Sequence, residues 1–180
     1  FMTTVMTRRQ FLDRFGIAAA VSIGSGIFPP PLALRSADAG SLKKGTVGRK
    51  RSPYYTPVND QTIRCDLCPH ACTINKGKRG RCGVRENKDG RCDTLVYANP
   101  CVINVDPIEK KPFYHVLPGS RSLSIATAGC NLNCKFCQNW EMSRARPEDT
   151  FNYDLSPEKA VQNALRYRVR SIASSYVEPT

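Results

Sequence analysis

Three cysteines with the spacing C-x3-C-x2-C constrain this chain more than any other feature of its sequence. They lie in the run Gly129-Cys130-Asn131-Leu132-Asn133-Cys134-Lys135-Phe136-Cys137. Cysteine thiolates hold iron–sulfur clusters, and a four-iron cluster held by only three thiolates keeps one iron open for another molecule. Catalytic zinc sites likewise keep one position free of protein ligands, whereas structural sites are closed. The spacing therefore favours a reactive [4Fe–4S] centre, and the alternative is three incidental thiols in a loop.

A second group of cysteines lies earlier in the chain, with the pattern Cys65-x2-Cys68-x3-Cys72-x9-Cys82. Four thiolates in so short a stretch can surround one metal centre, because zinc takes four cysteines tetrahedrally and iron–sulfur clusters also take four. We expect a second metal site here, with an iron–sulfur cluster favoured over zinc. Two disulfides are the alternative if the chain is exported. His70 is expected to face solvent from a turn, because four cysteines already complete a site.

The residues around both groups resemble a known superfamily. The pattern C-x3-C-x-aromatic-C, with Phe136 as the aromatic residue, resembles the hallmark of radical S-adenosylmethionine (radical SAM) enzymes. Four further runs are similar to the AmmeMemoRadiSam-system branch, which is related to the pyruvate formate-lyase activating enzymes: Arg64-Cys65-Asp66-Leu67-Cys68-Pro69-His70, Arg81-Cys82-Gly83-Val84-Arg85, Asp106-Pro107-Ile108-Glu109-Lys110-Lys111-Pro112 and Cys137-Gln138-Asn139-Trp140-Glu141. The resemblance covers about residues 54–180. Cys92 and Cys101 lie outside its motifs and are expected to be ordinary small buried residues.

The resemblance implies a cofactor, a reaction and partners. Cys130, Cys134 and Cys137 would hold a [4Fe–4S] cluster whose open iron binds SAM. Reductive cleavage of SAM would give a 5′-deoxyadenosyl radical that takes a hydrogen atom from an unidentified substrate. Phe136 is expected beside the adenine and Glu178 beside the methionyl amino group, where Glu178-Pro179 matches the second half of the family's Gly-Gly-Glu-Pro. The implied partners are SAM, an electron donor such as a flavodoxin or ferredoxin, and Memo-like proteins of the same system.

Local sequence patterns predict the same architecture. Residues 121–127 alternate polar and apolar side chains, which predicts a strand running into the cysteine loop. Ser156-Pro157-Glu158 predicts a helix start, with an N-cap serine, proline in the first position and an acid against the helix dipole. A short strand is expected at 171–176. This order predicts an α/β fold, namely the first βαβ unit of a radical SAM partial (β/α) barrel, with the cysteine loop and Glu178 at the carboxyl ends of strands.

The expected organisation has four parts. Residues 1–39 carry paired arginines at Arg8 and Arg9, an apolar stretch at 17–28 and a small-x-small site at 37–39, and so resemble a twin-arginine-type signal. Residues 40–60 are expected to be a basic linker, 61–120 a small Cys-rich metal-binding segment with its connector, and 121–180 the first part of the barrel. Since one βαβ unit cannot close a barrel, we expect an N-terminal fragment that is inactive by itself. The signal predicts export to the periplasm or membrane anchoring, and a cytoplasmic location if it is not used.

The charge of the chain is compatible with two alternative functions. The 27 Lys and Arg against 15 Asp and Glu give a net charge of +12, which attracts acidic partners but does not determine a fold. A non-catalytic zinc or iron–sulfur binding or redox module would give a colourless zinc protein and salt-sensitive nucleic-acid binding. Nucleic acid is nevertheless not the expected partner, because a basic run such as 43–51 is more often a solvated tether. The second alternative is a glycyl-radical enzyme activase that acts on a protein backbone.

Overall fold

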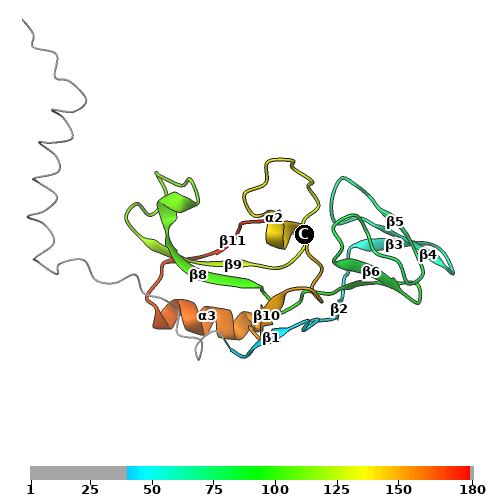
Figure 1. Ribbon diagram of the computed structural model, residues 1–180, viewed down its shortest axis with the longest axis horizontal. Coiled ribbons are helices and arrows are strands. Elements are labelled where there is room, and N and C mark those ends of the chain that lie inside the picture. The colour runs from blue at the N-terminus through cyan, green and yellow to red at the C-terminus, as the bar shows by residue number, and fades with distance from the viewer. Residues whose placement is uncertain (1–39, 179–180) are drawn as a thin grey trace, which may run out of the picture. The chain divides into compact units, whose positions relative to one another are not determined.

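The computed structural model describes residues 40–178 (Figure 1). Two predicted features lie outside the described residues: the signal with Arg8 and Arg9, and Pro179 of the Glu-Pro pair. Two α-helices, α2 (Trp140–Ser143) and α3 (Pro157–Arg166), and the 3₁₀ turn η2 (Ile108–Lys110) are described. The described strands are β1 (Leu42–Lys44), β2 (Lys50–Arg51), β3 (Tyr55–Asn59), β4 (Thr62–Cys65), β5 (Thr73–Asn75), β6 (Arg85–Lys88), β7 (Arg91–Thr94), β8 (Val102–Pro107), β9 (Arg121–Ala126), β10 (Phe151–Tyr153) and β11 (Ser171–Ser174). None of the helices in this part of the chain has the length and apolar character needed to cross a membrane.

The C-terminal half is built on a three-stranded sheet in the order β11-β9-β8. Strand β9 pairs antiparallel with β8 and parallel with β11, with Ser122 opposite Ser171. This parallel pair, with α3 between its strands in sequence, confirms the expected βαβ order. Figure 1 shows α3 along one face of the sheet, where Ala160 and Ala164 pack in an apolar cluster with Leu123. The described sheet ends at three strands, so the larger barrel stays a prediction.

Helix α3 begins where the sequence predicts. The Oγ of Ser156, its N-cap, accepts a hydrogen bond from the backbone N–H of Lys159 at 3.3 Å, and this satisfies one of the free donors of the first turn. Ala160, Asn163 and Ala164 are buried, whereas Val161 and Leu165 are exposed. The buried stripe of α3 is therefore narrow and is formed by two small side chains and one polar side chain.

Two small three-stranded sheets, β3-β4-β5 and β2-β7-β6, form the cysteine-rich half. Their shared apolar core contains Ile63, Ile74, Cys65 and Cys92. The core side chains come from β4, β5 and β7, which alternate buried and exposed positions as half-buried strands do. This core holds the turns that carry Cys68, Cys72 and Cys82 next to one another.

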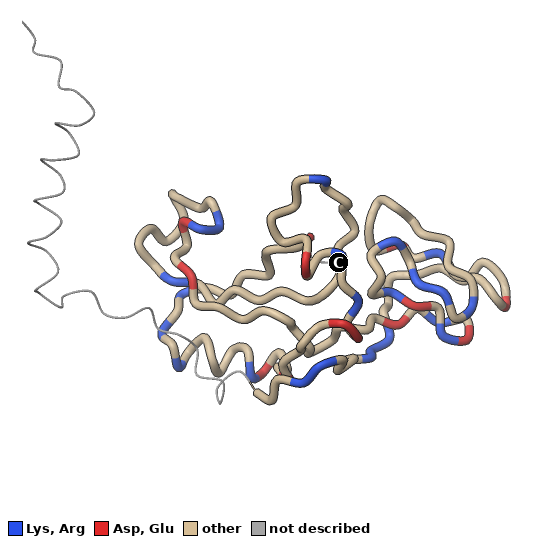
Figure 2. Tube along the Cα trace, viewed as in Figure 1, with Lys and Arg blue, Asp and Glu red and all other residues tan. Residues whose placement is uncertain are grey.

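Residues 40–60, expected to be a linker, contain three paired strands. Strand β1 pairs with β10, β2 with β7 and β3 with β4. The basic side chains of Lys43, Lys44 and Lys50 are exposed, as expected, and Figure 2 shows Lys and Arg along this segment. The segment therefore keeps its charges in water while its backbone N–H and C=O groups are hydrogen-bonded to later strands, so it is not a free tether.

Candidate metal centre

The three-cysteine loop begins directly after β9, at the carboxyl end of the strand that pairs with both neighbours. Gly129 turns the chain into the loop with φ at +85°, a conformation that glycine adopts without steric cost. Its N–H donates to the carbonyl of Met142 at 2.9 Å, which closes the loop against α2. Cys130 and Cys137 are half-buried and Cys134 is exposed. The three thiols therefore lie at the surface end of a strand, where a ligand can reach them.

Hydrogen bonds already reach two of the three sulfurs. The backbone N–H groups of Leu132 and Glu178 each lie 3.4 Å from Cys130 Sγ. The Oγ of Ser143 lies 3.5 Å from Cys137 Sγ. Hydrogen bonds to cluster sulfurs are one of the protein's means of setting a cluster's reduction potential. Both donors on Cys130 are backbone N–H groups.

The donor set of the loop fits a cubane cluster in kind. It offers three thiols and hydrogen bonds to sulfur, which is the ligand chemistry that iron–sulfur clusters need. No three His, Cys, Asp or Glu side chains within residues 40–178 are arranged to hold a single metal ion. A cubane distributes its thiolates over different irons, so its ligands need not converge on one point as the ligands of a single ion do. The lack of a single convergence point therefore does not count against a cluster at Cys130, Cys134 and Cys137.

Phe136 and Glu178 are the two residues expected to contact SAM. Phe136 belongs to the cysteine loop itself, and the fold places Glu178 beside that loop. Glu178 lies two residues beyond the turn that follows β11, and its N–H reaches Cys130 although its side chain is exposed. Phe136 is 92% exposed, so its ring is open to a ligand and does not belong to the core. The expectation for Phe136 and Glu178 rests on the resemblance, and both remain accessible as it requires.

The four earlier cysteines line one narrow cavity. Cys65 is buried and Cys68, Cys72 and Cys82 are half-buried, and all four contribute to its wall. The cavity has a volume of about 10 Å³, room for roughly one water molecule. All nine cysteines of the chain lie within the described residues and are free thiols. The turns therefore bring together the four side chains that the spacing singled out, without the disulfides of the alternative interpretation.

Cys92 is a neighbour of this cavity that sequence reasoning missed. It is fully buried, as expected, but its thiol is hydrogen-bonded to that of Cys65, and this bond lowers the pKa of Cys65 against the opposing effect of burial. The same bond, together with burial, raises the pKa of Cys92. Cys65 is therefore the more acidic of the two thiols. Nothing in the spacing indicates this pair, because it depends on β7 packing over β4.

The other cysteine outside the motifs, Cys101, is half-buried, and burial raises its pKa to about 11.

Two buried polar atoms beside the four cysteines lack partners. Arg85 is 9% exposed and Asn131 is 7% exposed, and both line the cavity. Arg85 Nε and Asn131 Oδ1 have no hydrogen-bond partner in the described structure. An unpaired buried donor of a charged group is costly unless something balances it. Thiolates in this cavity would supply that balance for Arg85.

The two cysteine regions are in direct contact. His70 is exposed, as expected, but its Nε2 lies 2.9 Å from the carbonyl oxygen of Asn131 in the three-cysteine loop. Gly129 packs so closely against Cys82 that a β-carbon added there would lie 2.6 Å from the Cys82 carbonyl oxygen. The two groups of cysteines, far apart in sequence, therefore form neighbouring sites.

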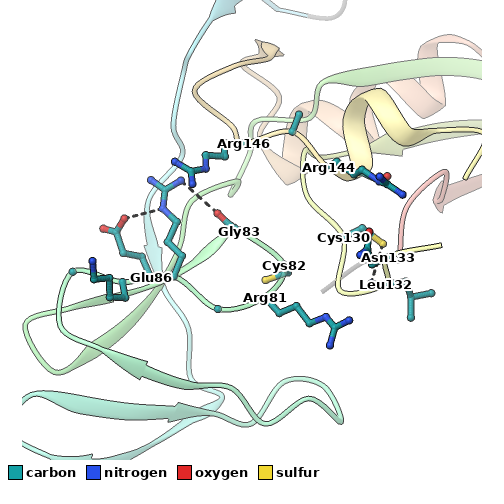
Figure 3. Close-up of a pocket in the computed structure, with 15 residues that line it drawn as sticks. Arg81, Cys82, Gly83, Glu86, Cys130, Leu132, Asn133, Arg144 and Arg146 are labelled. Atoms are coloured by element: carbon teal, nitrogen blue, oxygen red, sulfur yellow. Dashed lines mark hydrogen bonds and ion pairs between the residues drawn. The ribbon is translucent and has the colours of Figure 1, made fainter. Parts of the chain in front are cut away.

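A basic cavity of about 820 Å³ opens between the two regions. Figure 3 shows Arg81 and Cys82 on one side of it and Cys130 with Leu132 and Asn133 on the other. Glu86, an acid in its wall, is bound by Arg49 at 2.7 Å and by Arg79 at 3.1 Å. The positive charge of the remaining basic side chains is therefore not balanced by Glu86; these side chains are Lys78, Arg81, Arg144 and Arg146.

A second cavity lies at the carboxyl end of β11. It has a volume of about 510 Å³ and is lined by Lys110, Lys111, Asn139 and Tyr176, among others. His115, a few residues after the two lysines, is exposed and lies outside the wall of this cavity.

Comparisons with known proteins agree with this site. Residues 124–180, which carry the second half of β9, the cysteine loop, α3 and β11, match the family described as the Radical SAM superfamily. The match supports a radical SAM enzyme and, in general, iron–sulfur chemistry that cleaves SAM. An uncharacterized protein of Methanocaldococcus jannaschii is 38% identical over 131 residues, which are 73% of this chain and 39% of that protein. The chain thus spans about two fifths of the length of this relative. No solved structure matches the chain.

Proposed function

We propose that Cys130, Cys134 and Cys137 hold a [4Fe–4S] cluster in an enzyme that cleaves SAM reductively and abstracts hydrogen from a substrate. When bound, the cluster supplies the electron that splits the sulfonium C–S bond, which yields methionine and the 5′-deoxyadenosyl radical. The observation that carries the proposal is the geometry at Cys130, whose sulfur receives N–H groups both from its own loop and from Glu178 after β11. The radical SAM match over the same residues supports it.

The residues of this chain have separable tasks in the proposal. The three thiolates are the cluster ligands, and the N–H groups of Leu132 and Glu178 stabilise negative charge on the Cys130 sulfur. The carboxylate of Glu178 would receive the methionyl amino group of SAM, and the exposed ring of Phe136 would close over the adenine. The AmmeMemoRadiSam branch, with Memo-like partners, is proposed from the motifs quoted above.

An acidic flavodoxin or ferredoxin is proposed as the electron donor. The basic cavity beside Cys130 provides charge complementarity for such a protein, and electrostatic attraction of this kind accelerates association at low ionic strength.

Export by the twin-arginine-type signal is proposed from residues 1–39 alone, and cell fractionation with an antibody against the mature chain would test it.

The test of the function is an assay on the full-length protein, reconstituted with iron and sulfide without oxygen. With dithionite as reductant, SAM should give methionine and 5′-deoxyadenosine in equal amounts. With a reduced flavodoxin as the donor, the rate should fall as salt rises, whereas the dithionite-driven rate should change little. A colourless zinc protein that leaves SAM intact would instead support the non-catalytic module. A glycyl radical on an added protein would support the activase.

We also propose that Cys65, Cys68, Cys72 and Cys82 hold a second metal centre. Their shared cavity and the unpaired guanidinium Nε of Arg85 support it, because a positive group stabilises thiolates bound to a metal. As they stand, the four sulfurs do not form a closed single-ion site, so metal binding must draw the turns together.

The double variant Cys68→Ala, Cys82→Ala is expected to lose one metal centre and keep the other. Because metal binding and folding are coupled in small sites, residues 61–83 should become sensitive to protease in this variant. Limited proteolysis with mass spectrometry and metal analysis would measure both effects. Cys101→Ala, at a half-buried cysteine outside both groups, is the matched control and should keep both centres. Iron and sulfide beyond one cubane in the unaltered protein would indicate a cluster, one zinc per chain would indicate a zinc knot, and the absence of any second metal would contradict the proposal.

A further inference from the structure

Tyr176 stands in a backbone conformation that normally requires glycine. Its φ is +73°, in the left-handed region that a side chain with a β-carbon rarely adopts. It occupies the turn directly after β11, where the motif resemblance leads one to expect glycine. A bulky residue persists in such a conformation only when its surroundings hold it there.

Three hydrogen bonds hold Tyr176 in place. Its hydroxyl donates to Asp106 Oδ2 at 2.5 Å and accepts from Asn104 Nδ2 at 3.2 Å, so that its ring is tied to β8. Its carbonyl oxygen accepts a hydrogen bond from Asn139 Nδ2 at 2.7 Å, two residues beyond Cys137. Tyr176 is therefore bonded both to β8, an outer strand of the same sheet, and to the end of the cysteine loop.

Asp106 is the anchor of this network. Its side chain is 9% exposed and is bonded to Lys110 at 3.0 Å and to Lys111 at 2.9 Å. Burial by itself would raise the pKa of Asp106, but hydrogen bonds from Tyr176, Lys111 and Lys110 outweigh it and hold the pKa well below its usual range. Lys111 Nζ also lies 4.3 Å from the centre of the Tyr176 ring, a cation–π contact. The carboxylate thus stays charged and paired.

We infer that Asp106 and Tyr176 are positioning residues that set the segment ending in Glu178 against the cluster loop. Two residues after the fixed Tyr176 turn, the N–H of Glu178 reaches Cys130 Sγ at 3.4 Å. A glycine at 176 would adopt the same φ but would leave the segment free to take others. The bonded tyrosine selects one conformation and forms part of the wall of the 510 Å³ cavity beside it. The inference rests on the proposed function, since it assigns these residues a role in SAM binding.

The test compares SAM binding by variants of the reconstituted full-length protein. In Tyr176→Phe, which loses the hydroxyl contact to a charged group, the Kd for SAM is expected to rise about tenfold while iron and sulfide content stay unchanged. Binding is followed by the change that SAM causes in the electron paramagnetic resonance spectrum of the reduced cluster. Asp106→Asn keeps one acceptor oxygen and should weaken binding less than Asp106→Ala. The matched control is Tyr97→Phe, where Lys50 Nζ likewise lies 4.0 Å over a tyrosine ring, and it should bind SAM normally.

The variant Tyr176→Gly tests whether SAM binding needs the hydrogen bonds of the tyrosine side chain, or only a residue that can adopt the left-handed backbone conformation. This variant removes the strain and the network together, and weaker SAM binding than in the unaltered protein would support the inference. Normal binding by Tyr176→Gly, or by both Tyr176→Phe and Asp106→Asn, would overturn it. If Tyr176→Phe fails to fold, SAM binding by Asp106→Asn and Tyr176→Gly decides the question: weaker binding supports the inference and normal binding overturns it. Failure of the proposed function looks different, because the unaltered protein would then not cleave SAM at all.

Discussion

Replacement of any one of Cys130, Cys134 and Cys137 with alanine is expected to abolish SAM cleavage by the full-length protein. Two thiolates cannot hold a cubane with one defined open iron, so the variants should lose both the cluster and the reaction. The measurement is 5′-deoxyadenosine and methionine released under anaerobic conditions with dithionite, together with iron and sulfide per chain. The loss should reach the detection limit, because ligand removal eliminates the site that reacts.

The control for these variants is Cys101→Ala. This cysteine is also half-buried, and its Sγ lies 3.5 Å from the carbonyl oxygen of Ala126 at the end of β9, so it tests whether loss of any thiol near this strand matters. It should keep the cluster and the reaction. Unchanged cleavage in the triple variant of Cys130, Cys134 and Cys137 would show that the loop is not the cluster site and would refute the proposed function.

Gly129→Ala is expected to lower the free energy of unfolding by about 3 kcal/mol, because a left-handed conformation and an overpacked contact coincide there. The φ of Gly129 is +85°, and a β-carbon would lie 2.6 Å both from the Cys82 carbonyl oxygen and from Val84 Cγ1. The backbone of one cysteine region would have to move away from the other. Urea unfolding, followed by circular dichroism, measures the effect.

Gly77→Ala provides the matched control. Gly77 has a φ of +71°, but no atom lies within 4 Å of the position that its β-carbon would take. This variant therefore carries the conformational cost alone, about 1 kcal/mol. The difference between the two variants measures how tightly the two cysteine regions pack. Equal losses would show that the contact between Gly129 and Cys82 yields without cost.

The contact between the two cysteine regions changes how the second site is understood. The spacing in the sequence suggests a remote knot whose loss affects stability before chemistry. In the structure His70 is bonded to the carbonyl oxygen of Asn131, and Asn131 lines the cavity of the four cysteines. A change in the earlier site therefore acts directly on a residue next to Cys130, so the double variant Cys68→Ala, Cys82→Ala should be examined for altered cluster spectra as well as for protease sensitivity.

Local features of this protein were predictable because they depend on short-range chemistry. The C-x3-C-x2-C spacing, the alternation that forms β9 and the capping at Ser156 each involve residues within a few positions of one another. Such features carry their own physical signal, in ligand geometry, side-chain period or a free N–H that needs an acceptor. The parallel pairing of β9 and β11 followed from them, because a helix between two strands returns the chain in the same direction.

Sequence alone indicated which residues are candidate metal ligands and determined where the strand, loop and helix lie, while the tertiary structure decided which of these parts meet. The pairing of β1 with β10, the bond between Cys65 and Cys92, and the network of Asp106 with Tyr176 each join segments distant in the chain. Such contacts depend on how whole strands bury their apolar faces, which no local pattern encodes. Tyr176 shows this most clearly, because its left-handed backbone is unfavourable in isolation and is stabilised by residues of β8 and of the cysteine loop that only the folded chain brings to it.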